Sequence, residues 1–197
     1  MGDRPVIWTA GHSNHTFEKF TELLAEEAIG VVVDVRSYPY SRFASRFNRE
    51  QLAAGLSAAG IRYLYLGKEL GGRPTSNDHY DAEGRAIYGL MAKEPAFRAA
   101  IARVLRGAAE HRVALVCAEA RPQECHRRLL VGKVLTDRGA VLRHILPAGH
   151  VSAETAVEVG ATGDQPSLFG EGEEAAWTSA RPVSHRRRVT HLNPYLV

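Results

Sequence analysis

Residues 112–127, RVALVCAEARPQECHR, hold both cysteines of the chain together with an acid and a His-Arg pair. A thiolate beside an imidazole can act as a nucleophile and attack an electrophilic substrate. We therefore expect Cys125 or Cys117 to carry covalent chemistry, with His126 as a base and Glu119 as a further catalytic group.

The sequence on either side predicts where these residues lie. Residues 113–116 are a short apolar run, typical of a buried strand that ends at Cys117. Cys125 then opens a segment whose apolar residues recur at helical spacing until Gly139. Unpaired N–H groups at the start of a helix stabilise a thiolate, so we expect Cys125 to have the lower pKa and to be the more reactive thiol.

The rest of the chain alternates strands and helices. Apolar runs predict four more strands at residues 5–10, 30–37, 61–67 and 140–147. Helices are expected to begin near Thr16, Asn48 and Pro95. Five strands separated by helices predict a three-layer α/β fold, in which a mainly parallel sheet has helices on both faces.

Ligands of such sheets bind outside the carboxyl ends of the strands, and several polar residues follow the predicted strands. The candidates for binding an anionic substrate are Ser13, Asn14, Asp34, Arg36, Arg42 and Arg127, and His12 is a second candidate base. Arg36 and Arg127 are expected to hold an oxyanion such as phosphate together.

Each of these groups also has a structural interpretation. Asp34 and Arg36 can form an ion pair with each other, His12 can satisfy the backbone of a turn, and Cys117 can pack as a small apolar side chain. Residues 38–47 lack a clear period and are expected to form a functional loop, and residues 68–85 are expected to form a lid or binding loop.

Composition predicts one globular domain with an appendage. The chain has 197 residues, of which 45% are hydrophobic and 24% charged, and its composition changes after residue 149. We expect an α/β domain at residues 1–149 and an irregular tail at residues 150–197, partly flexible or packed on the domain. With two cysteines, no long apolar run and no signal-peptide pattern, a cytoplasmic protein without membrane contact is expected.

The tail contains the sequence QPSLF at residues 165–169. It resembles the Q-x-x-L-F peptide by which bacterial DNA-processing proteins bind the replicative sliding clamp. Gln165, Leu168 and Phe169 are therefore candidate partner-binding residues, with the two apolar side chains filling a pocket of the clamp. Alternatively, Leu168 and Phe169 pack on the domain and anchor the tail.

Several motifs together resemble the domain-of-unknown-function 488 family over about residues 6–146. These are GHSN, VDVRSYPYSRF, the Phe-Asn pair at residues 47–48, LG-x-ELGG and CAE-x5-CHR. The resemblance implies a compact α/β domain and no assigned activity. A looser similarity to rhodanese-like and phosphatase-like domains rests on a DVR that ends one strand and a Cys that ends another, but Cys117 does not open their Cys-x5-Arg phosphate loop.

Three functions follow from these observations. The first is a thiol-dependent enzyme that acts on an anionic substrate containing a phosphate or a nucleotide. The second is a non-catalytic module that binds a nucleotide or a nucleic acid. The net charge of +3 is compatible with such a ligand. The third is a metal site with Cys117, Cys125 and either His126 or His12 as ligands, although the eight-residue step between the cysteines is longer than in common zinc motifs. The sequence points to no particular cofactor.

Overall fold

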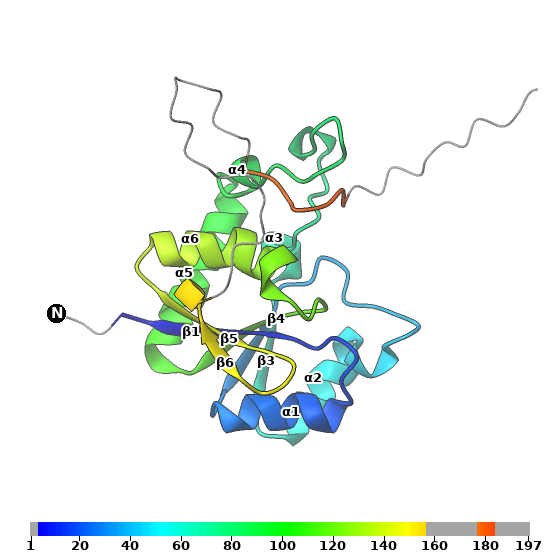
Figure 1. The fold of residues 1–197 in the computed structure, drawn as a ribbon, viewed down its shortest axis with the longest axis vertical. Helices are drawn as coiled ribbons and strands as arrows, with labels where there is room; N and C mark the ends of the chain where they lie inside the picture. The colour runs from blue at the N-terminus through cyan, green and yellow to red at the C-terminus, as the bar shows by residue number, and fades with distance from the viewer. Residues whose placement is uncertain (1–3, 157–176, 184–197) are drawn as a thin grey trace, which may run out of the picture.

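A single sheet forms the centre of the molecule in a computed structural model that describes residues 4–156 and 177–183 (Figure 1). The strands of this sheet are β1 (Val6–Gly11), β2 (Val31–Asp34), β3 (Arg62–Tyr65), β4 (Val113–Cys117), β5 (Val141–Ile145) and β6 (Val151–Ala153). Their order is β3-β2-β4-β1-β5-β6, and all neighbours are parallel except β6, which pairs antiparallel with β5. The expected α/β fold is thus confirmed, with six strands in place of five.

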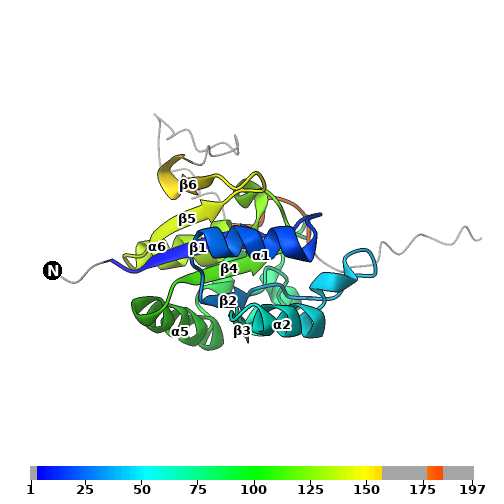
Figure 2. The same cartoon turned by 90° about the horizontal axis from the view of Figure 1, so that it is seen from below.

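Helices cover both faces of the sheet (Figure 2). They are α1 (Phe17–Glu26), α2 (Arg49–Ala58), α3 (Gly67–Leu70), α4 (Tyr88–Met91), α5 (Pro95–Glu110) and α6 (Lys133–Asp137), with the π-helical turn η4 (Arg127–Gly132) before α6 and the short 3-10 turns η1 (Ser45–Phe47), η2 (Asn77–His79), η3 (Pro122–Glu124) and η5 (Glu154–Ala156). Trp8 and Val116 pack with α1 and α2 on one face, whereas Ile7 and Leu115 pack with α5 and α6 on the other. Strands buried on both faces explain the continuous apolar runs.

The register of the central strands decides which residues meet at the carboxyl edge. β1 pairs with β4 so that Gly11 lies opposite Cys117, and β2 pairs with β4 so that Asp34 lies opposite Val116. The residues that follow β1, β2 and β4 therefore emerge side by side.

The helix after the second cysteine begins one residue later than expected. Cys125 itself is extended, with φ −103° and ψ 135°, and its carbonyl accepts the N–H groups of Arg128 and Leu129. Cys125 is thus the residue that caps the helix. The first part of that helix is a π-turn, a feature often found at functional sites, and Gly139 ends the segment with φ +90°.

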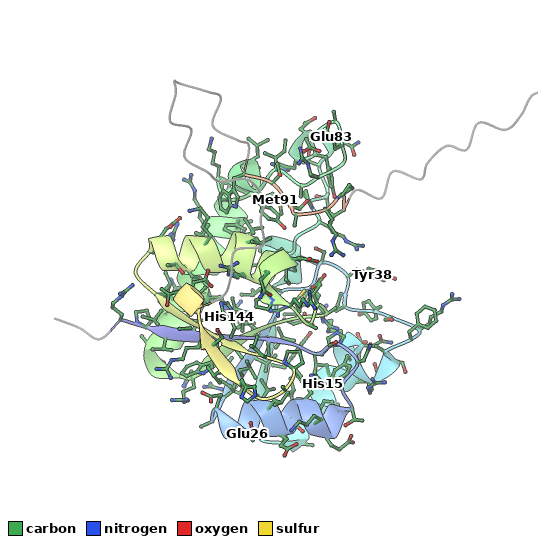
Figure 3. The ribbon with its side chains drawn as sticks, in the orientation of Figure 1. His15, Glu26, Tyr38, Glu83, Met91 and His144 are labelled. Carbon is green, nitrogen blue, oxygen red and sulfur yellow. The ribbon has the colours of Figure 1, made fainter. Side chains whose placement is uncertain are left out.

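Two segments of the expected tail pack against the domain. β6 extends the sheet, and a partly buried chain of polar contacts holds the turn that follows it. Thr9 Oγ1 lies 2.8 Å from His144 Nδ1, His144 Nε2 lies 2.6 Å from Glu154 Oε2, and Arg128 Nε donates to Glu154 Oε1 at 2.8 Å (His144 is labelled in Figure 3). Residues 177–183, coloured orange-red in Figure 1, lie beside α4, where Thr178 bridges to Ile87.

The predicted clamp-binding residues Gln165, Leu168 and Phe169 lie outside the described residues. Across residues 4–156 and 177–183, every helix is too short or too polar to cross a membrane.

Candidate functional site

A pocket of about 930 Å³ opens at the carboxyl edge of the sheet. Cys117, Glu119 and His126 line it, together with three aromatic residues of the loop after β2. Five arginines also line this edge pocket, namely Arg36, Arg46, Arg73, Arg121 and Arg181. Glu119 and Glu124 are the carboxylates among its lining residues, so positive charge is in excess and an anionic ligand is favoured.

A cluster of four residues lies at the edge pocket: Cys117, Glu119 and His126, which line it, and Cys125, which is buried beside them. Their sulfur, oxygen and nitrogen atoms all lie within 4.8 Å of one another. Glu119 Oε2 accepts from Cys117 Sγ at 2.5 Å and from Cys125 Sγ at 3.1 Å. His126 Nδ1 lies 3.7 Å from Cys117 Sγ and 3.9 Å from Cys125 Sγ. Both cysteines are buried, whereas the Glu119 side chain is exposed at the pocket.

His126 is held in one orientation. Its Nε2 lies 2.8 Å from the carbonyl oxygen of Val35, so the Nε2–H group donates to the backbone and Nδ1 faces the two sulfurs. On the other side the ring packs against the backbone of Gly72, where a Cβ atom would lie 2.6 Å from His126 Cγ. Only a glycine at position 72 leaves room for the imidazole.

The pKa values of the two thiols are shifted in opposite directions. Burial together with the nearby sulfur of Cys125 raises the pKa of Cys117 well above its ordinary value. Burial also opposes ionisation of Cys125, but the hydrogen bond from Cys117 and the positive charges of Arg127 and His126 outweigh it and lower its pKa well below the ordinary value. Of the two thiols, Cys125 therefore has the lower pKa, which is the direction expected from the sequence.

Arg127 lies in a different place from the one expected of a substrate ligand. Its side chain is fully buried, and its Nη1 and Nη2 donate to the carbonyls of Glu119 and Ala120 at 2.6 and 3.0 Å. Its Nε has no hydrogen-bond partner among the described residues. Arg127 thus braces the loop that carries Glu119 and places a positive charge beside the cluster, and it does not join Arg36 in a shared oxyanion site.

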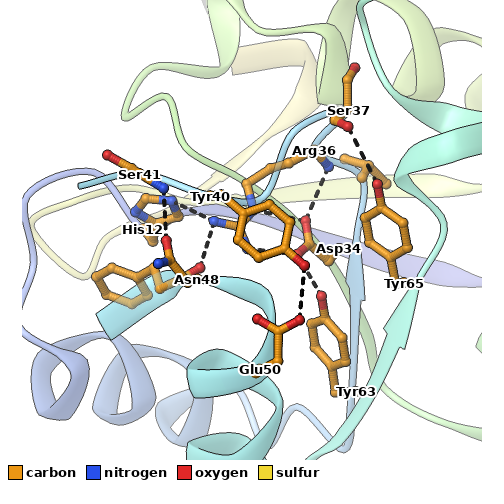
Figure 4. Close-up of polar contacts among 12 residues, drawn as sticks. His12, Asp34, Arg36, Ser37, Tyr40, Ser41, Asn48, Glu50, Tyr63 and Tyr65 are labelled. Carbon is orange, nitrogen blue, oxygen red and sulfur yellow. Dashed lines mark hydrogen bonds and ion pairs between the residues drawn. The ribbon is translucent and has the colours of Figure 1, made fainter. Parts of the chain in front are cut away.

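Asp34 and Arg36 form a buried ion pair (Figure 4). Asp34 Oδ1 accepts from Arg36 Nε at 2.9 Å, and Oδ2 accepts from Nη2 at 2.6 Å and from Tyr63 Oη at 2.7 Å. The structural interpretation of this pair therefore holds, although Arg36 still borders the edge pocket.

His12 is a poor candidate for a base. Arg36 Nη1 donates to its Nε2 at 3.1 Å, which makes Nδ1 the protonated nitrogen that donates to the carbonyl of Ser13 at 3.1 Å. Burial, followed by the charge of Arg36, lowers the pKa of His12 to about 4. Its ring also stacks on Phe47 at 4.3 Å between centroids. Both ring nitrogens are occupied, so His12 supports the edge of the pocket and has no lone pair for a substrate.

The remaining predicted residues separate into two groups. Ser13 and Asn14 line the edge pocket, and Ser13 has a φ of +44°, in the left-handed region that is strained for a serine. Arg42 is exposed and its guanidinium lies 4.6 Å over the Phe43 ring, outside the pocket lining.

Other residues of the site were not predicted from the sequence. Arg121 lines the pocket and lies between Cys117 and Cys125 in the sequence. That position, beside the candidate catalytic residues, could have identified it. Gly72 belongs to a quoted motif but gave no sign of its contact with His126. Arg181 carried no signal, because only the packing of residues 177–183 brings it to the pocket, where it pairs with Glu124.

The fold and the site define a class: an α/β domain with a Cys-Glu-Cys-His cluster at the carboxyl edge of a parallel sheet. The family model described as domain of unknown function DUF488 matches residues 16–134, and the chain belongs to this family. The match does not show a relationship to rhodanese-like domains. The chain matches no curated protein and no protein of solved structure.

Proposed function

We propose that the chain is an enzyme for an anionic substrate whose catalytic centre is a single metal ion, best matched by Zn²⁺, bound by Cys117, Cys125 and His126. The observation that carries this proposal is the convergence of two sulfurs, one imidazole nitrogen and one carboxylate oxygen within 4.8 Å. Thiolate and imidazole ligands in tetrahedral arrangement favour zinc over the harder cations.

The distances fit one ion. Zn–S bonds of about 2.3 Å and Zn–N bonds of about 2.0–2.1 Å place sulfur and nitrogen about 3.6 Å apart in a tetrahedral site. The separations of 3.7 and 3.9 Å between His126 Nδ1 and the sulfurs of Cys117 and Cys125 are close to this value. The contact from His126 Nε2 to the Val35 carbonyl is the kind that orients ligating histidines.

The charges also balance around an ion. Two thiolates and the Glu119 carboxylate carry three negative charges in a mostly buried place. A divalent cation and the buried Arg127 guanidinium together supply three positive charges. This arrangement gives Arg127 a counter-charge, since its hydrogen bonds go to backbone carbonyls.

The position of Glu119 supports a catalytic centre over a closed structural site. Its side chain is exposed at the pocket, so a water or a substrate oxygen can take its place beside the ion. Glu119 is then placed to accept a proton from that water, while pocket arginines such as Arg121 hold the negative charge of the substrate. Hydrolysis by an activated water is the reaction class that this layout favours.

A second candidate function is the thiol-dependent enzyme expected from the sequence. The lowered pKa of Cys125 favours it, and Cys117 lines the edge pocket. The burial of both sulfurs argues against it, because a nucleophile must reach its substrate.

Metal content decides between the two. Elemental analysis of protein purified without chelators is expected to find about one zinc per chain, and zinc added to chelator-treated protein is expected to raise its melting temperature. Bound metal should also protect both thiols from brief alkylation by iodoacetamide. Protein that lacks stoichiometric metal and in which one of the two thiols alkylates rapidly would instead support the thiolate enzyme.

The fit between Gly72 and His126 gives a test of ligand positioning. Gly72→Ala is expected to push the imidazole out of place and weaken zinc binding by about 10–100-fold, as changes beside metal ligands commonly do. Gly89→Ala is the matched control, because a Cβ atom at position 89 meets nothing within 4 Å. Equal zinc affinities of the two variants would show that the contact with Gly72 does not position His126.

A further inference from the structure

The loop between β2 and η1 exposes aromatic rings beside the edge pocket. Tyr38 is 71% exposed and Phe43 is 81% exposed, and Tyr40 is also exposed at 41%. All three line the pocket, and Tyr38 lies on this loop at the outer side of the domain (Figure 3). Solvent-exposed rings lose hydrophobic stabilisation, so their concentration on one loop indicates a surface that is covered by a ligand.

The loop holds these rings in place before any ligand binds. Asn48 Oδ1 accepts from the Ser41 backbone N–H at 2.7 Å, and Tyr40 Oη donates to Glu50 Oε1 at 2.8 Å (Figure 4). The Tyr38 and Tyr40 rings meet edge to face at 5.5 Å between centroids. A ligand that stacks on this loop therefore has less ordering entropy to overcome.

Arginines lie on or near the same loop. Arg42 lies over the Phe43 ring, and Arg46 lies over the Phe47 ring at 5.2 Å while its Nε donates to the His15 carbonyl. Arg121 is exposed on the loop between the two cysteines and lines the pocket. Among the described residues, none of these three guanidinium groups forms an ion pair with a carboxylate.

We propose that the substrate of this pocket is a single-stranded nucleic acid, whose bases stack on Tyr38 and Phe43 and whose phosphates contact Arg46 and Arg121. The inference rests on the proposed function, because it names the substrate class of the same centre. Stacking platforms interleaved with arginines are the means by which proteins bind single strands without reading sequence. One nucleotide of the strand then enters the edge pocket, whose volume of about 930 Å³ accommodates it.

The exposed rings and the arginines together favour a single strand over other ligands. A duplex keeps the faces of its bases stacked inside, so they cannot stack on the exposed rings of Tyr38 and Phe43. A small anion such as phosphate needs the arginines and not the rings. An apolar peptide needs the rings, but the arginines beside them lower its affinity through desolvation.

Fluorescence anisotropy with a labelled 12-nucleotide single strand of mixed sequence tests the inference on the full chain as purified. DNA and RNA strands of the same sequence form two arms, and the unlabelled annealed duplex serves as competitor. Tyr38→Ala and Phe43→Ala are each expected to weaken binding by about 5–150-fold, the range for loss of one base–aromatic stack. Leu90→Ala, which removes a 38% exposed side chain outside the pocket lining, should leave binding unchanged.

The salt dependence gives a second readout. Each phosphate contact to a single strand contributes about −0.7 to the slope of log K against log salt, so Arg121→Ala should make the slope less steep by about 0.7. Arg98→Ala, an exposed arginine of α5, should not change it.

The outcomes separate this inference from the proposed function. A duplex that competes as well as the single strand, or alanine variants that bind as the wild type does, would overturn the nucleic-acid inference while zinc content in the same preparation still supports the metal centre. Ring-dependent binding by protein that holds no zinc would keep the inference and overturn the metal centre.

Discussion

Cys125→Ser is expected to lower the affinity for zinc by at least about 100-fold, because loss of a supporting contact alone costs 10–100-fold and here a thiolate ligand itself is removed. Cys125 supplies the sulfur whose pKa is lowered by the hydrogen bond from Cys117 and by the charge of the Arg127 guanidinium. A serine hydroxyl at this place remains protonated and binds zinc weakly. Titration of the chelator-treated variant with zinc, followed by a colorimetric competitor, measures the affinity directly.

Two nearby acids give variants for comparison: Glu119→Gln tests the catalytic carboxylate, and Glu124→Gln is the control. Glu119→Gln should retain zinc on Cys117, Cys125 and His126 but lose turnover, whereas Glu124→Gln, at an exposed acid outside the cluster, should change zinc affinity little. Circular dichroism before titration shows that each variant is folded. Zinc affinity of Cys125→Ser equal to that of the wild type would remove Cys125 from the ligand set.

Asp34→Ala is expected to lower the free energy of unfolding by about 3–5 kcal/mol, the usual cost of leaving a buried charge without its partner. Asp34 is fully buried and Arg36 is 7% exposed. The Asp34 carboxylate accepts two guanidinium hydrogen bonds and one from Tyr63 Oη, all of which the substitution removes. Urea unfolding at neutral pH measures the loss.

Two further variants show whether the loss comes from the buried charge. Asp137→Ala breaks an exposed pair with Lys133 and should have little effect, since water already solvates both groups. Adding Arg36→Met to Asp34→Ala removes the unpaired charge and should recover part of the stability. A loss in Asp34→Ala no greater than in Asp137→Ala would mean that water reaches Arg36.

The Asp34–Arg36 pair connects stability to the site. The same guanidinium that binds Asp34 donates from Nη1 to His12 Nε2 and to the Phe47 carbonyl. It therefore fixes the imidazole and the start of α2 at the edge of the pocket. A change at Asp34 should disturb that edge as well as the core.

The sequence by itself determined the layers of the fold and the members of the cluster. Apolar runs at β1 and β4 are buried on both sides and could only be strands of a covered sheet, and strand direction then carried Cys117 to the carboxyl edge. Glu119, Cys125 and His126 lie close to Cys117 in the fold because they are within nine residues of it in the sequence.

Only the tertiary structure decided what those residues can do. Arg127, at the start of the π-turn, points inward and its guanidinium donates to the carbonyls of Glu119 and Ala120, an orientation that residue type does not encode. β6 joins the sheet by antiparallel pairing with β5, and Glu154 after it binds Arg128 and His144. Arg181 reaches the pocket through the packing of residues 177–183. Local pattern specifies elements through short-range backbone preference, whereas the partners of a buried polar group depend on which surfaces meet after the sheet has formed.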